Sequence, residues 1–131
     1  MNLEKDELFL HPGLYIARSD VHRWGVFTSV DIKKNDVLQE SPYCTFSESE
    51  VEESEVLVRY TYSTDGQGGI DDLVLGFGFA ALYNHSTEAN ARYQIDSVNE
   101  VMRHYATEDI PADSEIFLDY GYGDDEDWGD Y

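Results

Sequence analysis

The 131-residue sequence has little cysteine and no long apolar run. Its single cysteine, Cys44, excludes an internal disulfide framework and any zinc site built from several cysteines. A lone cysteine in a strand pattern is more typical of a core residue than of a nucleophile. No apolar stretch approaches the roughly 20 residues that cross a membrane, and the acidic N-terminus lacks a signal-peptide core. We therefore expect a soluble, intracellular protein from a reducing compartment.

The usual catalytic motifs are also missing. The four histidines, which are His11, His22, His85 and His104, have no metal-ligand spacing among themselves or with nearby acids. Neither a nucleophile-elbow G-x-S-x-G nor a Walker loop occurs. The sequence therefore predicts no metal site and neither of these two catalytic classes.

Basic residues are scarce: 8 Lys and Arg stand against 28 Asp and Glu, a formal net charge of −20. Such a charge repels a nucleic-acid backbone and attracts a basic partner. Taken alone, the charge is explained more simply by solubility or adaptation to salt. The acidic run 47–55 fits a solvated loop or helix face. The second run, 124–130, contains Trp128 and precedes Tyr131, which favours a tail that packs against the protein.

The length suggests one domain with a modest core. Strand patterns dominate, with polar turns between them. We predict strands at 14–19 and 24–30, a strand at 36–46 interrupted at Pro42, a hairpin from 91–97 and 100–107, and a strand at 115–120. The segment 55–63 fits either a helix or a strand, 64–70 a loop, and 73–85 a short helix or tight turns. The sequence therefore predicts a mostly β domain.

Tyrosine is abundant, with ten residues in the chain. Each one alone is compatible with an ordinary aromatic core. A cluster of them forms a different feature, a narrow aromatic channel for an aliphatic side chain with a cationic tip. Tyr60 and Tyr62 lie two residues apart and share a face if their segment is a strand.

Three segments, in this order, resemble the SET-domain protein lysine methyltransferases. The first is "HRWGVFTSVDIKKNDVLQE" (22–40), similar to the family's R-G-x-G-V-F segment. The second is "LGFGFAALYNHSTEANARY" (75–93), similar to the family's segment with N-H-S and a second asparagine six residues after the first. The third is "DIPADSEIFLDYGY" (109–122), similar to its I-x-x-x-E-E-[IL]-x-x-x-Y-G segment.

The resemblance implies a fold and an activity. It implies a single SET domain over 1–131, matched at about 11–128, with several small β-sheets around a pseudoknot-like threaded C-terminal segment and an acidic aromatic tail at 124–131. The short length resembles the compact viral members, which would place the protein in the host cytoplasm or nucleus. The implied reaction is methyl transfer from S-adenosyl-L-methionine, leaving S-adenosyl-L-homocysteine, to a lysine of a histone-like basic protein, without metal, nucleic acid or membrane. A homodimer is left open.

The resemblance also assigns residues. It assigns cofactor binding to Trp24, Gly25, Val26, Asn84 and His85, and it assigns the catalytic role to Tyr120. It assigns the lining of the lysine channel to Tyr60, Tyr93 and Tyr122, with Tyr62 as the alternative to Tyr60. A tyrosine at position 93 implies mono-methylation or di-methylation of the product rather than tri-methylation.

The chain departs from the family pattern at several points. Arg23 stands where the family has the first glycine of G-x-G, and we expect its charge to pair with the cofactor carboxylate. Ala89 replaces the proline of N-H-S-x-x-P-N. The cysteine-rich module that closes the channel in many members is absent, and the aromatic tail is our candidate replacement. A catalytically silent peptide-binding module and an acidic decoy protein remain the alternatives.

Overall fold

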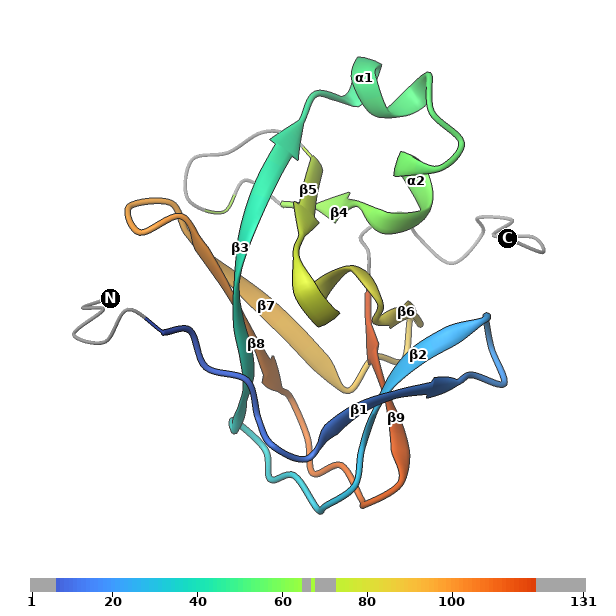
Figure 1. Cartoon of the computed structure of the whole chain (residues 1–131), viewed down its shortest axis with the longest axis vertical. Helices are drawn as coiled ribbons and strands as arrows, with labels where there is room; N and C mark the ends of the chain where they lie inside the picture. The colour runs from blue at the N-terminus through green and yellow to red at the C-terminus, as the bar shows by residue number, and fades with distance from the viewer. Residues whose placement is uncertain (1–6, 65–66, 68–72, 120–131) are drawn as a thin grey trace.

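The computed structural model describes residues 7–64, 67 and 73–119, and its strands form two small sheets (Figure 1). One sheet has the order β1-β2-β9-β6 and the other has the order β4-β5-β3-β8-β7. The strands are β1 Leu14–Arg18, β2 Trp24–Thr28, β3 Val37–Phe46, β4 Tyr62–Ser63, β5 Leu73–Gly76, β6 Asn84–His85, β7 Ala91–Asp96, β8 Val101–Ala106 and β9 Ser114–Leu118. The helices are α1 Glu48–Glu52, α2 Leu57–Tyr60 and the 3-10 helix η2 Gly78–Ala81. The predicted mostly β architecture is confirmed.

The smaller sheet joins the two ends of the described chain. Strands β1 and β2 form an antiparallel hairpin, and β9 lies antiparallel beside β2, with Val26 opposite Ile116. The two-residue strand β6 then pairs in parallel with β9, with Asn84 opposite Phe117. This arrangement places the N-H-S segment next to the segment that leads toward Tyr120, which lies outside the described residues together with Tyr122 and the tail (Figure 1).

The predicted break at Pro42 is wrong, because β3 runs through it as one ten-residue strand. The first half of β3 pairs with β8, up to Pro42 opposite Val101. The second half pairs with β5 on the other side, starting at Tyr43 opposite Gly76. Pro42 therefore lies where the pairing changes sides, and its carbonyl accepts a hydrogen bond from Phe77 N–H at 3.0 Å. A proline is tolerated at this point because no ladder bond there requires its missing N–H.

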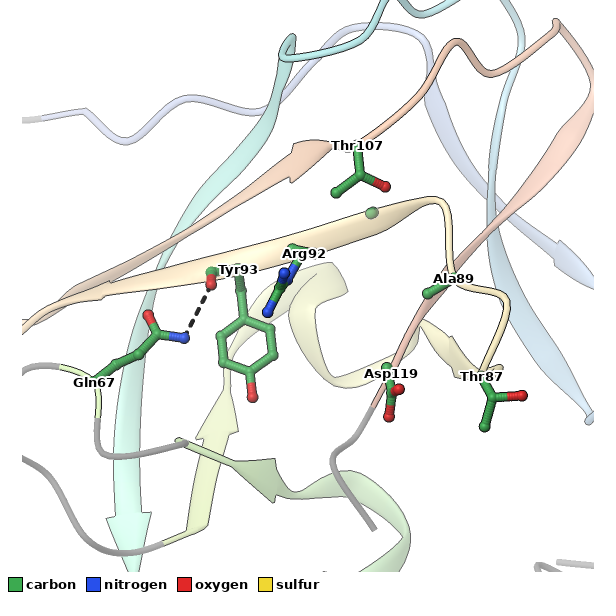
Figure 2. Close-up of a pocket in the computed structure, with 8 residues that line it drawn as sticks. Gln67, Thr87, Ala89, Arg92, Tyr93, Thr107 and Asp119 are labelled. Atoms are coloured by element: carbon green, nitrogen blue, oxygen red, sulfur yellow. Dashed lines mark hydrogen bonds between the residues drawn. The ribbon is translucent and has the colours of Figure 1, made fainter. Parts of the chain in front are cut away.

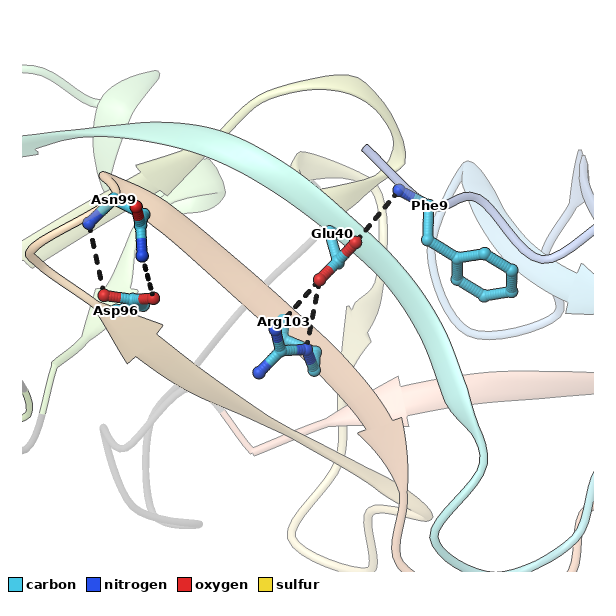
Figure 3. A network of polar contacts seen from close by, with 5 residues as sticks. All are labelled: Phe9, Glu40, Asp96, Asn99 and Arg103. Atoms are coloured by element: carbon cyan, nitrogen blue, oxygen red, sulfur yellow. Dashed lines mark hydrogen bonds and ion pairs between the residues drawn. The ribbon is translucent and has the colours of Figure 1, made fainter. Parts of the chain in front are cut away.

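The hairpin of β7 and β8 forms as predicted, and polar side chains close it and join it to β3 (Figure 3). Asp96 accepts hydrogen bonds from the backbone N–H and the side-chain amide of Asn99. These bonds hold the pKa of Asp96 at about 2. On the neighbouring pair of strands, the Arg103 guanidinium donates to the Glu40 carboxylate at 2.9 Å. The opposite charges of directly opposed residues thus stabilise the β3–β8 register.

Three segments for which the sequence left alternatives open contain short elements. The acidic run begins α1 through a capping box, in which Ser47 accepts from Glu50 N–H and the Glu50 carboxylate accepts from Ser47 N–H. The ambiguous segment 55–63 contains both structures, α2 followed by β4. The segment 73–85 differs from the prediction, since β5 precedes the short helix η2. An apolar run of four residues cannot be assigned to helix or strand by its periodicity alone.

The core lies between the two sheets and includes several aromatic residues. Its fully buried large side chains include Val26, Leu38, Tyr62, Tyr83 and Met102. Cys44 is only half-buried on β3, and burial raises the pKa of its thiol. Within the described ranges, no helix is long and apolar enough to cross a membrane, and no three potential metal ligands gather.

Candidate functional site

Asn84 is the centre of the polar contacts around the predicted cofactor segment. Its side chain is 7% exposed, and its Nδ2 donates to the carbonyls of His22 and Trp24 at 3.0 and 3.3 Å. The same nitrogen donates to Glu115 Oε2 at 2.7 Å. Because Nδ2 carries only two hydrogens, these three acceptors share them. Asn84 on β6 therefore fixes the start of β2 against β9.

Glu115 is a site residue that the sequence reasoning did not identify. Its Oε1 accepts a hydrogen bond from Ser19 Oγ at 2.7 Å, while its Oε2 accepts from Asn84. Ser19 Oγ in turn accepts from the backbone N–H of Val21 and His22. One carboxylate thus organises the whole turn between β1 and β2. The available signal was an acidic residue directly before the apolar residues Ile116, Phe117 and Leu118 of strand Ser114–Leu118.

Gly25 is required by the close approach of these two side chains. A Cβ atom at position 25 would lie 2.3 Å from Glu115 Oε2 and 3.0 Å from Asn84 Nδ2. Neither partner can withdraw without breaking the hydrogen bond between them. Val26, also predicted to bind cofactor, is fully buried in the core, so only its backbone is a candidate for contact with a ligand.

Arg23 occupies a conformation that favours glycine. Its φ is +37°, and its carbonyl accepts from Ser19 N–H at 2.8 Å to close the turn between β1 and β2. A side chain in this left-handed region costs on the order of 1 kcal/mol. The family pattern has glycine here, and this chain keeps the glycine-like backbone while it adds a cation.

We expect Arg23→Gly to be more stable to unfolding than Arg23→Ala by about 1 kcal/mol. Both variants lose the Arg23 side chain, so their difference isolates the backbone conformation. Denaturant unfolding of the two purified variants measures it. At Arg92, the second residue of β7, the same pair of substitutions is expected to give the opposite order, because glycine weakens a strand. Equal free energies of unfolding for the two Arg23 variants would show that the left-handed backbone at position 23 carries no strain.

A cavity of about 140 Å³ opens beside this turn. It is lined by His22, Arg23, Trp24, Arg59, Tyr60, Ala81, Leu82 and Asn84. Trp24 is 50% exposed, and the Arg18 guanidinium lies 4.3 Å from the centre of its ring. Burial lowers the pKa of His22, and the charge of Arg23 lowers it further. The cavity therefore combines cationic and aromatic groups within a strongly acidic protein.

His85 lies beside Asp119 on the other side of Asn84. Its Nδ1 is 3.9 Å from Asp119 Oδ1, and His85 pairs with Leu118 on β9. Burial lowers the pKa of His85, and the carboxylate of Asp119 opposes that shift. The predicted cofactor residue His85 thus lies close to Asp119, the last described residue, which immediately precedes Tyr120 in the sequence.

A second cavity, of about 480 Å³, lies at the outer edge of β7 (Figure 2). It is lined by Gln67, Thr87, Ala89, Ala91, Arg92, Tyr93, Thr107 and Asp119. Gln67 Nε2 donates to the Tyr93 carbonyl at 3.2 Å, and Ile95 N–H donates to Gln67 Oε1 at 2.9 Å. The amide of Gln67 therefore pairs with this edge strand as the backbone of a further strand would.

The predicted channel tyrosines lie in different places. Tyr60 lines the smaller cavity together with the cofactor candidates. Tyr93 lines the larger cavity and is 8% exposed, and its hydroxyl donates to the Ser63 carbonyl. Tyr62 is fully buried and packs on Tyr93, with 4.7 Å between the ring centres. The structure thus brings Arg23, Trp24, Asn84 and Tyr60 together, and places Tyr93 with Tyr62 behind it.

Comparisons with known proteins concern the family and the fold of the chain. A family model described as the SET domain matches residues 23–121. The histone-lysine N-methyltransferase MEDEA of Arabidopsis thaliana is 32% identical over 123 residues, which cover 88% of this chain and 18% of that protein. An H3 lysine-4 specific histone-lysine N-methyltransferase of Emericella nidulans is 30% identical over 115 residues, covering 81% of this chain and 9% of that protein. The chain therefore spans less than a fifth of the length of either relative.

Two solved structures share the fold. A Plasmodium falciparum protein classed as a histone methyltransferase superposes with a TM-score of 0.66 at 31% identity, covering 87% of this chain and 97% of that one. The SET domain protein DIM-5 of Neurospora, a histone lysine methyltransferase, superposes with a TM-score of 0.60 at 21% identity. That match covers 88% of this chain and 55% of the DIM-5 chain.

Proposed function

The chain belongs to the SET-domain family, and on this premise we propose that it is a protein-lysine methyltransferase. The proposed reaction transfers a methyl group from S-adenosylmethionine to the ε-amine of a lysine in a histone-like basic protein. The observation that carries the proposal is the hydrogen bonding of Asn84, which holds the segment His22–Trp24 around the 140 Å³ cavity. The similarity of this chain to the two histone-lysine methyltransferases named above supports the class of reaction.

The residues of the smaller cavity fit this cofactor. Arg23 and Arg59 supply positive charge for its carboxylate, and the rings of Trp24 and Tyr60 supply flat apolar surface for its adenine. The hydrogen bonds of Asn84 within the described residues use Nδ2, which leaves Oδ1 to accept from an amino group of the ligand. When bound, S-adenosylmethionine supplies an electrophilic methyl group on a sulfonium.

The protein must present the substrate amine neutral and aligned. A lysine has an ordinary pKa near 10.4, and an ammonium has no lone pair for the attack. An aromatic channel removes water from the amine and so lowers its pKa. We assign the channel to Tyr93, Tyr120 and Tyr122, with Tyr120 beside the amine, and we place Tyr60 on the cofactor side. The positions of Tyr120 and Tyr122 in this proposal rest on the family motif alone.

Tyr93→Phe is expected to raise the number of methyl groups added per lysine while it leaves S-adenosylmethionine affinity unchanged. The hydroxyl, which lies at the Ser63 carbonyl, would hold a water or the amine in space that a larger product requires. Mass spectrometry after prolonged incubation measures the product ratio. Tyr15→Phe, at a half-buried tyrosine whose hydroxyl donates to Asp113, is the matched control. A product ratio identical to that of the native protein would count against this role of Tyr93.

The net charge of −20 favours a basic substrate. Opposite charge accelerates the encounter and gives little sequence recognition by itself, so the steering should weaken as salt is added. The larger cavity, at the edge strand β7, offers Asp119 as a carboxylate contact for a basic peptide.

An assay in two steps tests the proposal. A thermal-shift measurement with S-adenosylmethionine is expected to stabilise the protein, since a ligand that binds only the folded state raises its stability. An array of lysine peptides with labelled cofactor then reports methyl transfer. Stabilisation without transfer to any peptide or to core histones would favour a silent binding module. The absence of both effects would favour an acidic interaction protein.

A further inference from the structure

A histidine lies at the centre of the buried aromatic cluster, and no step of the proposed mechanism uses it. His104 on β8 is fully buried. Its ring stacks on Tyr83 with 4.9 Å between centres and an interplanar angle of 18°. Its edge meets Tyr62, whose hydroxyl lies 2.9 Å from His104 Nε2. The ring of Tyr93 lies 6.0 Å from it.

The direction of the hydrogen bonds in this cluster is fixed by counting protons. The Tyr62 hydroxyl has one proton and donates it to the Ala80 carbonyl at 2.7 Å. It must therefore accept from His104, which carries its proton on Nε2. The Tyr83 hydroxyl donates to Gln39 Oε1 at 2.6 Å, so Tyr83 contacts His104 only through its ring. Full burial disfavours the charged imidazolium, so His104 is neutral, with its proton on Nε2 and Nδ1 as a bare acceptor.

Retaining this histidine is costly to the fold. His104 Nδ1 is buried and has no hydrogen-bond partner among the described residues. A buried acceptor without a partner costs free energy that an apolar ring of similar size would not. What the imidazole adds over such a ring is a directional bond, which fixes the position of the hydroxyl end of Tyr62.

The cluster connects the two parts of the candidate site. On one side, Tyr83 directly precedes Asn84, whose amide holds the smaller cavity. On the other side, Tyr62 packs on Tyr93 at 4.7 Å, and Tyr93 lines the larger cavity. His104 touches both Tyr83 and Tyr62, so it lies between the Asn84 segment and the Tyr93 ring.

We propose that His104 is a positioning residue which, through its hydrogen bond to Tyr62, holds Tyr93 in place and thereby limits the number of methyl groups transferred. The second half of this proposal rests on the proposed methyltransferase function. The first half concerns only the geometry of the cluster and is tested without turnover.

The test compares His104→Phe with His104→Gln and with Met102→Leu. His104→Phe keeps an aromatic ring and removes the Nε2–H donor, whereas His104→Gln restores an N–H donor without the ring. Met102 is equally buried on the same strand and contributes no hydrogen bond to the cluster, so Met102→Leu controls for a general loss of packing. Two quantities are measured well below each unfolding temperature: the product ratio, and the NMR resonance of the ¹³C-labelled Tyr93 ring, assigned with Tyr93→Phe.

In His104→Phe the Tyr93 resonance is expected to shift. The ratio of higher to lower methylated product is expected to rise about fivefold, the change that one hydrogen bond of typical strength produces. The Michaelis constant for S-adenosylmethionine should stay unchanged, and His104→Gln should partly restore the native ratio. A Tyr93 resonance and product ratio in His104→Phe that match those of Met102→Leu would overturn the proposal. If His104→Phe does not fold, Tyr62→Phe removes the same bond and is subject to the same criteria.

If the native protein transfers no methyl group, the proposed function fails, and the NMR measurement still decides the positioning role. If the native protein methylates lysine but the Tyr93 resonance is unshifted in His104→Phe, the positioning role of His104 is rejected and the proposed function stands.

Discussion

Asn84→Ala is expected to weaken S-adenosylmethionine binding at least about tenfold and to lower the free energy of unfolding by about 2 kcal/mol. The substitution removes the donor shared by the His22 and Trp24 carbonyls and by Glu115 Oε2. These part-buried acceptors then lose their partner, and the turn that lines the smaller cavity is released. Calorimetric titration with the cofactor and denaturant unfolding measure the two effects.

Two further variants sharpen this prediction. Asn84→Asp places a second carboxylate at the position now 2.7 Å from Glu115 Oε2, so it is expected to be more harmful than Asn84→Ala at neutral pH. Asn99→Ala removes an equivalent amide-to-carboxylate bond, to Asp96, in a turn away from the site. It should leave cofactor affinity intact. Native affinity in Asn84→Ala would refute the central role given to this side chain.

His104 should make the folded protein sensitive to acid. Burial lowers the pKa of His104 from 6.5 to about 3. The unfolded chain therefore binds a proton as the pH falls through 6.5, while the folded protein does not bind it until about pH 3. The contribution of the neutral imidazole to stability is complete above pH 6.5 and is lost below it, at about 1.4 kcal/mol per pH unit. By pH 4.5 the loss amounts to about 3 kcal/mol.

The measurement is the free energy of unfolding between pH 4.5 and 8 in the native protein and in His104→Phe. The carboxylates titrate in both proteins, so the difference between the two curves isolates His104. That difference should be flat above pH 7 and should slope below it, with the native protein losing more stability. Parallel curves over the whole range would show that the imidazole is accessible to protons in the folded state.

The sequence predicts those parts of the structure that local patterns encode. The strands near 14–19, 24–30 and 91–107 follow from alternation and turn residues, and the acidic run begins a helix through its own capping box. The strand through Pro42 was not predictable, because the exchange of pairing partners there depends on β5 and β8, both distant in sequence.

The candidate site shows the same division. The motif located Asn84 and Trp24, and the structure brings them within hydrogen-bond distance. Glu115 was missed because its role depends on the register of β2 against β9, which places its carboxylate over Gly25. The choice between Tyr60 and Tyr62 also depended on structure. Helix α2 ends between them and sends Tyr60 to a cavity and Tyr62 into the core.

The most direct test of the account is intact-mass analysis of a lysine-containing histone peptide after incubation with S-adenosylmethionine and either the native protein or Tyr120→Phe. The account predicts a peptide carrying one or two added methyl groups with the native protein, and a strongly reduced yield with Tyr120→Phe. An unmodified peptide with the native protein, across a set of basic peptides and core histones, would contradict the proposed methyltransferase function.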